Sequence, residues 1–190
     1  LHKVSVSIHT DPQLKQGHML RWIDVNWRRN YIRTITDFCH WVVAKSAKTV
    51  DVKIIELHPG TSKTSSLSAL KESIMDLFEF LQKDFPGTLI VVENRTSKNT
   101  SGAGRSIAGT AEDLLKLADL ILKEDESIIT KFGFAIDVQQ LYTEYNKDTR
   151  KLELGILRIL RYDPRLLKVF HIHTKHRAIS EFDLIPWEFI

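Results

Sequence analysis

The stretch Leu89-Ile-Val-Val-Glu93 is a short apolar run that ends in a carboxylate. A run of this length, rich in β-branched residues, is typical of a parallel strand that is buried on both faces. Asp84-Phe-Pro-Gly87 stands just before it and is expected to end a helix. The segment therefore predicts a helix-to-strand step with a polar residue at the carboxyl end of the strand.

Four other stretches are also expected to be strands, and most of the five are β-branched or aromatic with few charges: Val4–His9, Val52–His58, Phe132–Asp137 and Leu167–His173. Between the strands lie segments with apolar residues at helical spacing: Tyr31 to Val43, Leu67 to Leu81, Leu114 to Ala118 and Leu152 to Leu160. Thr110-Ala-Glu-Asp113 has the pattern of a capping box before the third of these. Strands that alternate with helices predict a parallel sheet with right-handed crossovers.

The predicted strand ends recur at broadly even intervals, which suits a TIM barrel or an open doubly wound sheet. A full barrel takes eight strands and about 250 residues, whereas this chain has 190. No linker or low-complexity stretch divides it. We expect an α/β fold, a TIM-barrel-like parallel sheet that is incomplete, with five to six β/α units in one domain over residues 1–190.

The composition is that of a folded protein, with 43% hydrophobic and 27% charged residues. No apolar run approaches the length of a membrane span. The single cysteine, Cys39, excludes an internal disulfide and lies in an apolar helical pattern, so we expect a core residue. These features predict a cytoplasmic protein without a membrane partner. The net charge of +3 permits an anionic partner without requiring one.

Potential metal ligands stand at the carboxyl ends of the predicted strands: His9, His58, Glu93, Asp137 and, in the last strand, His171. Functional residues of parallel β/α folds gather at this end of the sheet. Imidazole and carboxylate are ligands suited to zinc, manganese or iron. The five residues together therefore predict a metal site.

Structural explanations remain open for each residue taken alone. His58 precedes Pro59-Gly60 and is also compatible with a simple turn. Glu93 and Asp137, if buried, would need partners, which a structural salt bridge could supply. The prediction that His9 binds a metal depends on the other strand-end residues, because a histidine after a strand is by itself a weak signal.

A loop from Arg95 to Arg105 is basic and rich in hydroxyl groups and glycine. Such a loop can hold phosphate through backbone N–H groups and cations, and the alternative is a solvated surface loop. The candidate phosphate- or substrate-binding residues are Asn94, Arg95, Lys98 and Arg105, together with His173 and Lys175 after the last strand.

Several strand-end motifs resemble those of the endonuclease IV family, which belongs to the xylose-isomerase-like TIM barrels. The motifs are His58-Pro-Gly60, Glu93-Asn94, Ile136-Asp137 and Lys168-Val-Phe-His171, and Ser101-Gly-Ala-Gly104 resembles the family's glycine-rich loop. The resemblance extends from about Val4 to Lys175. It implies a zinc-dependent hydrolase that cleaves the DNA phosphodiester 5′ to an abasic site.

The resemblance also implies roles for the strand-end residues. His9, His58 and Glu93 match the ligands of the family's first metal. Glu93, the residue expected to be catalytic, would bridge to a second ion completed by Asp137 and His171. The ions would activate a hydroxide and neutralise charge on the phosphate oxygens.

The sequence departs from the family in three places. Gln140 stands where the family has a histidine, Asp183-Leu-Ile185 is a partial remnant of an Asp-Arg-His motif, and the closing glutamate has no counterpart. We therefore expect one or two divalent ions, zinc first, with manganese or magnesium as alternatives. The chain would be a fragment, a protein completed by a partner, or a reduced relative.

Two other functions stay open at this stage. One is a sugar isomerase or epimerase of the same superfamily, acting on a small sugar or phosphorylated substrate. The other is a non-catalytic remnant that binds a partner through open sheet edges, including a homo-oligomer that completes the sheet.

Overall fold

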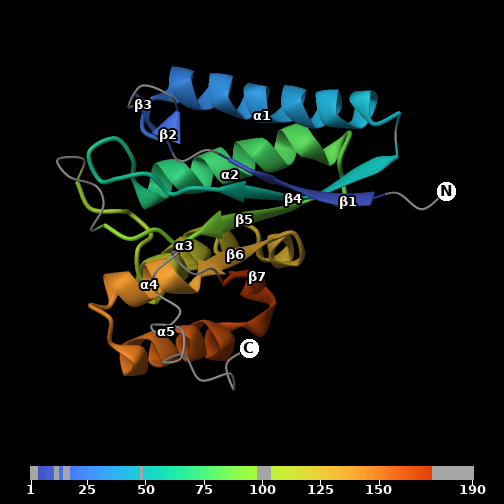
Figure 1. The fold of residues 1–190 in the computed structure, drawn as a ribbon. Helices are drawn as coiled ribbons and strands as arrows, with labels where there is room; N and C mark the ends of the chain where they lie inside the picture. Colours follow the sequence, from blue (N-terminus) through green and yellow to red (C-terminus); the bar gives the residue numbers. More distant parts are fainter. Residues whose placement is uncertain (1–3, 11–12, 15–17, 48, 98–103, 173–190) are drawn as a thin grey trace, which may run out of the picture.

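The computed structural model describes residues 4–10, 13–14, 18–47, 49–97 and 104–172. Figure 1 shows its elements in chain order: β1 (Val4–His9), β2 (Gln13–Leu14), β3 (His18–Met19), α1 (Val25–Lys45), β4 (Val50–Leu57), α2 (Leu67–Gln82), β5 (Leu89–Glu93), α3 (Ala111–Leu122), η1 (Glu126–Thr130), β6 (Phe132–Asp137), α4 (Val138–Glu144), α5 (Thr149–Tyr162), η2 (Pro164–Leu166) and β7 (Leu167–His171).

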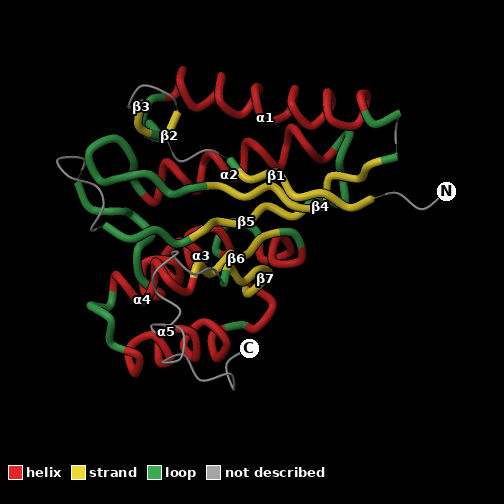
Figure 2. Tube along the Cα trace, in the orientation of Figure 1, coloured by secondary structure: helices red, strands yellow, loops and turns green. Residues whose placement is uncertain are grey.

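Five strands form one parallel sheet in the order β1-β4-β5-β6-β7 (Figure 2). Each strand pairs with the next sheet strand along the chain, and right-handed crossovers then place the connecting helices on one face. In agreement, α1 packs beside α2, α2 beside α3, and α3 beside α5. The predicted α/β class with an incomplete, TIM-barrel-like parallel sheet is confirmed. The small antiparallel ribbon of β2 and β3 was not predicted from the sequence.

The sheet curls into a half-barrel. Five strands in a flat sheet would place the outer two about 19 Å apart. The imidazole rings of His9 on β1 and His171 on β7, the two edge strands, have centroids only 5.9 Å apart. The carboxyl ends of the edge strands therefore approach each other across the face of the sheet opposite the helices, which we call the concave face.

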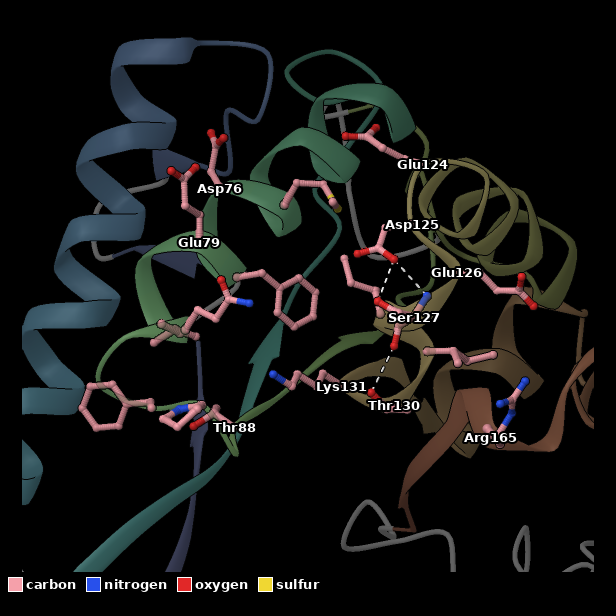
Figure 3. Close-up of a pocket in the computed structure, with 18 residues that line it drawn as sticks. Asp76, Glu79, Thr88, Glu124, Asp125, Glu126, Ser127, Thr130, Lys131 and Arg165 are labelled. Carbon is pink, nitrogen blue, oxygen red and sulfur yellow. Dashed lines mark hydrogen bonds between the residues drawn. The ribbon is translucent and has the colours of Figure 1, made fainter.

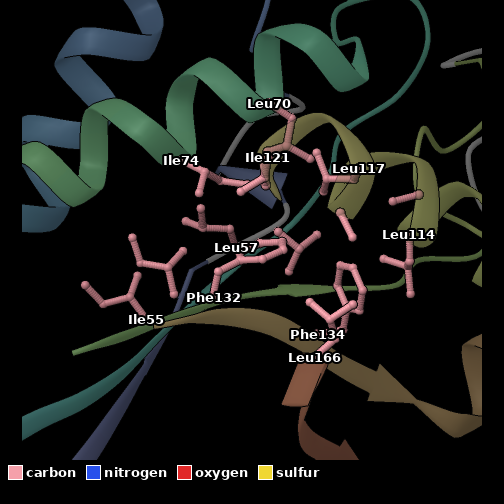
Figure 4. Close-up of a cluster of buried hydrophobic side chains, with 14 of the residues drawn as sticks. Ile55, Leu57, Leu70, Ile74, Leu114, Leu117, Ile121, Phe132, Phe134 and Leu166 are labelled. Carbon is pink, nitrogen blue, oxygen red and sulfur yellow. The ribbon is translucent and has the colours of Figure 1, made fainter. Parts of the chain in front are cut away.

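The hydrophobic core fills the space between the sheet and the helices. Ile55 and Leu57 of β4 meet Leu70 and Ile74 of α2 in this layer, as Figure 4 shows. All four side chains are almost fully buried. The strands thus supply the long apolar runs seen in the sequence, and the helices cover them with one apolar face each.

Two shifts in strand register decide which side chains reach the concave face. Val6 pairs with Val52, but the next residue of β1 pairs with Ile54, so Lys53 is an extra residue in β4. Glu56 consequently pairs with His9 on the concave face instead of sharing the core face with Val52.

The second shift lies between β6 and β7. Phe134 pairs with Leu167 and the following Ala135 pairs with Val169, so Lys168 is the extra residue. This shift places His171 beside Asp137 on the concave face, whereas an unbroken strand would have kept it on the same face as Leu167.

The predicted helix signals also take their expected places. Thr110 and Asp113 form the predicted capping box of α3, and α2 ends at Gln82, just before Asp84-Phe-Pro-Gly87. Cys39 is fully buried, as predicted. Among the described residues, no helix is long and apolar enough to span a membrane.

We predict that Leu70→Ala lowers the free energy of unfolding by about 2 to 5 kcal/mol, because it leaves a cavity between α2 and the sheet. Leu120→Ala, on the outer side of α3 where the side chain is 40% exposed, is the matched control and should cost less than about 0.5 kcal/mol. Urea unfolding of both variants measures the difference. Equal losses would contradict the described core.

Candidate metal centre

Four side chains converge at the carboxyl end of the concave face. They are His9 from β1, Glu56 from β4, Glu93 from β5 and His171 from β7. One potential ligand atom from each lies within 4.8 Å of all the others. The curl of the sheet makes this possible, because it brings both edge strands toward the two central carboxylates.

The shortest contacts join each imidazole to both carboxylates. His9 Nε2 lies 2.7 Å from Glu56 Oε1 and 3.4 Å from Glu93 Oε2. His171 Nε2 lies 3.2 Å from Glu56 Oε2, and its Nδ1 lies 3.2 Å from Glu93 Oε1. The two carboxylates are almost fully buried, while the side chain of His9 is 50% exposed and that of His171 is 29% exposed. The centre is therefore closed at its base and open to solvent on the histidine side.

His58 supports the cluster from its buried side. Its Nε2 lies 2.6 Å from Glu93 Oε2, and its ring meets that of His9 edge-on with centroids 4.8 Å apart. The side chain is only 1% exposed. Trp22 donates a hydrogen bond from its indole N–H to the backbone carbonyl of His58, which fixes the loop that follows β4.

The donor set fits a divalent cation. Glu56 Oε1 and Glu93 Oε2 are buried and have no partner in hydrogen-bond geometry among the described residues, although imidazole nitrogens lie close to both. Nitrogen and oxygen ligands about 2.1 Å from one ion lie about 3.0 to 3.4 Å from each other. The imidazole–carboxylate contacts of 2.7 to 3.4 Å are near this spacing, and one ligand atom from each of the four residues lies within 4.8 Å of the others. Two imidazoles and two carboxylates suit zinc or manganese.

The electrostatics of the cluster agree with a site built for positive charge. The adjacent carboxylates, Glu56 first and then Glu93, raise the pKa of His9 from 6.5 to about 10. Burial by itself would raise the pKa of Glu93, but His58 and His9, with a smaller contribution from His171, hold that pKa well below its usual range. A cation bound in the centre would offset the charge of the two carboxylates, as the proton on His9 does in the metal-free protein.

Asp137, predicted as a ligand, lies outside the four-residue group. Its carboxylate caps α4 by accepting hydrogen bonds from the backbone N–H and the side-chain amide of Gln140, at 3.0 and 3.1 Å. Asn94 is fully buried and bridges two strand ends, because its side chain both accepts from the backbone N–H and donates to the carbonyl of Asp137. These two residues connect β5 to β6 beneath the centre.

The predicted phosphate-binding residues are only partly described. Arg95 is half-buried, and its backbone N–H donates to the carbonyl of Ala108. Arg105 is exposed and pairs with Asp113 at 3.0 Å. Lys98, His173 and Lys175 lie outside the described residues. Whether any of them contacts phosphate stays a prediction.

Glu56 is the member of the cluster that sequence reasoning missed. It stands inside a predicted strand and not at its end, two residues before His58. The available signal was an acidic residue next to apolar strand residues, at the spacing that places it on the same face as His58.

Comparison with known proteins finds no sequence match and a distant likeness to solved structures. No protein-family model and no curated protein matches the sequence. Solved structures with a similar fold include the crystal structure of an AP endonuclease, family 2, from Brucella melitensis, with a TM-score of 0.43 and 14% sequence identity. The alignment covers 72% of this chain and 59% of that chain, so the match spans little more than half of the neighbour's length.

We predict that the protein binds one zinc or manganese ion at the cluster and that Glu56→Gln weakens this binding at least about tenfold, because it removes a buried anionic ligand. Glu153→Gln on α5 is the matched control and should bind like the wild type. Isothermal titration of protein previously stripped with a chelator measures both. Unchanged affinity in Glu56→Gln would contradict the assignment.

We also predict a pH dependence for the metal-free protein. Because the pKa of His9 is raised from 6.5 to about 10, its contribution to stability is fully present below pH 6.5 and is lost as the pH rises through about 10. The difference in unfolding free energy between the wild type and His9→Gln should therefore shrink between these limits. Urea unfolding with a chelator present measures it, and a difference that grows with pH would refute the prediction.

Proposed function

We propose that this protein is a metal-dependent hydrolase that cleaves DNA phosphodiesters at abasic sites. The observation that carries the proposal is the convergence of His9, Glu56, Glu93 and His171 at the carboxyl ends of the strands. The resemblance of the strand-end motifs to the endonuclease IV family supplies the substrate class, and the fit of the donor set to a divalent ion supplies the chemistry.

A divalent ion bound to these residues would polarise a phosphoryl oxygen and make a bound water acidic enough to attack at neutral pH. The protein's own part is to hold the donors in place. Glu56 and Glu93 project from neighbouring central strands, and His58 lies against Glu93 from the buried side. The two central strands and the contact with His58 keep the carboxylates oriented toward the open side of the centre.

The exposure of the centre favours a large substrate. His9 and His171 are partly exposed on the same side, so the ligands can be approached from solvent. Pockets for small molecules usually bury most of the ligand surface. An open centre in a chain of sequence pI about 8.9 suits a polyanion that lies across the strand ends.

A sugar isomerase or epimerase is the second candidate. One specific observation favours it: the carboxylate of Asp137 is bonded to Gln140 and lies outside the group of four ligand atoms. Among the described residues, the cluster then offers ligands for a single ion. A single ion that polarises a carbonyl or hydroxyl is sufficient for isomerisation but provides less charge for phosphodiester cleavage.

We predict that metal-loaded protein nicks a duplex that contains an abasic site, that EDTA abolishes the nicking, and that Glu93→Gln lowers its rate at least about a hundredfold. Glu153→Gln should keep the wild-type rate. Gel electrophoresis of the labelled duplex measures the nicking, and circular dichroism of each variant confirms that it is folded.

Three outcomes would decide against the nuclease. Nicking that Glu93→Gln leaves unchanged would show that the cluster is not the catalytic site. No nicking, together with metal-dependent interconversion of aldoses and ketoses in the same preparation, would favour the isomerase. Absence of both activities in protein that binds metal would leave the non-catalytic function.

A further inference from the structure

A second concave feature lies at the other end of the sheet. A pocket of about 980 Å³ opens between α2 and the segment that leads from the end of α3 through η1, shown in Figure 3. Its lining includes Thr88, Lys131 and Arg165, which precede β5, β6 and β7 respectively. The pocket, here called the amino-end groove, is therefore at the opposite end of the strands from the metal centre.

The floor of the amino-end groove is apolar and partly uncovered. Met75 and Phe78 of α2, Phe85 from the loop before β5, and Ile128 of η1 all pack against the core. Each is only partly buried, so apolar surface remains available to a partner. Burial of such surface is the general driving force for association.

The rim of the groove is acidic. Five of its lining residues are carboxylates and two are cations, although the whole chain carries a net charge of +3. The carboxylates are Asp76, Glu79, Glu124, Asp125 and Glu126. Three of them are engaged with Arg28, Lys71 and Ser127. Glu126 interacts electrostatically with Arg165 of the same groove, and Glu79 makes no hydrogen bond or ion pair with the described residues. The groove therefore favours a cationic partner with an apolar side chain.

Helix α5 of this same chain presents such a surface. Arg150, Leu154, Arg158 and Arg161 follow one another at helical spacing, so they share one face, and all four are exposed. Leu154 is 43% exposed. Arg158 pairs with Glu112 at the side of the helix, while Arg150 and Arg161 make no ion pair with the described residues.

We propose that the amino-end groove of one copy receives the basic face of α5 from a second copy. The charges are complementary, and Leu154 matches the apolar floor. The last turn of α5 lies at the same end of the sheet as the groove, since Arg165 just beyond it lines the pocket. A two-fold pair can therefore engage both contacts at once. This dimer goes beyond the proposed function, because its surfaces lie away from the metal centre.

Charge reversal tests the dimer. Sedimentation equilibrium should show a monomer–dimer equilibrium of the wild-type chain that weakens between about 50 and 300 mM salt. Glu79→Lys combined with Glu126→Lys should weaken the dimer at least about tenfold, and so should Arg150→Glu combined with Arg161→Glu. An equal mixture of the two double variants should associate again, because the mixed dimer has two attracting contacts in place of the two repelling contacts of each variant's own dimer. Arg29→Glu on α1, a charge reversal outside both surfaces, is the control.

Two results would overturn the proposal. One is a wild-type chain that stays monomeric up to about 200 µM at the lower salt concentration. The other is self-association that neither double variant changes while circular dichroism shows both to be folded. Metal binding should be unaffected in all of these variants, so failure of the dimer and failure of the proposed function can be told apart.

Discussion

Two buried carboxylates on neighbouring strands are the constraint on which the rest of this structure depends. Glu56 and Glu93 face the same side of the sheet and are almost fully shielded from water. Two like charges about 4 Å apart repel by about 4 kcal/mol at an effective dielectric constant of 20. Three imidazoles contact these carboxylates, two of them from the edge strands, and the sheet must curl for His9 and His171 to reach them. A bound divalent cation would neutralise this repulsion between the two carboxylates.

Much of this arrangement could be predicted from the sequence. The apolar runs that become β5 and β6 were predicted with the bounds that the structure shows, because a strand buried on both faces has few polar residues inside it. The edge strand β1, in which apolar residues alternate with serine, was also predicted with its observed bounds. The strand-end rule likewise found His9, Glu93 and His171. It missed Glu56 because the rule considered only the residue at the end of each predicted strand, and Glu56 stands two residues before His58. The register shift at Lys53, which sets the face of Glu56 relative to Val52, leaves no clear mark in the sequence.

Asp137 shows a second limit of prediction from sequence. A carboxylate at a strand end can bind a metal or cap the helix that follows, and both uses need the same residue at the same position. The structure shows the cap, with Gln140 as the side-chain partner of Asp137. The amino-end groove was not predicted either, because its walls come from α2 and η1, which are far apart in the chain and meet only through packing. The sheet thus carries a candidate metal centre at one end and a candidate docking surface at the other.

The most direct test of the central claim is anomalous-scattering crystallography of the protein crystallised with zinc or manganese. We predict one strong peak about 2.0 to 2.2 Å from a carboxylate oxygen of Glu56 and of Glu93 and from an imidazole nitrogen of His9 and of His171. A peak bound by Asp137 without Glu56, or no peak between the two glutamates in crystals that hold the metal elsewhere, would contradict it.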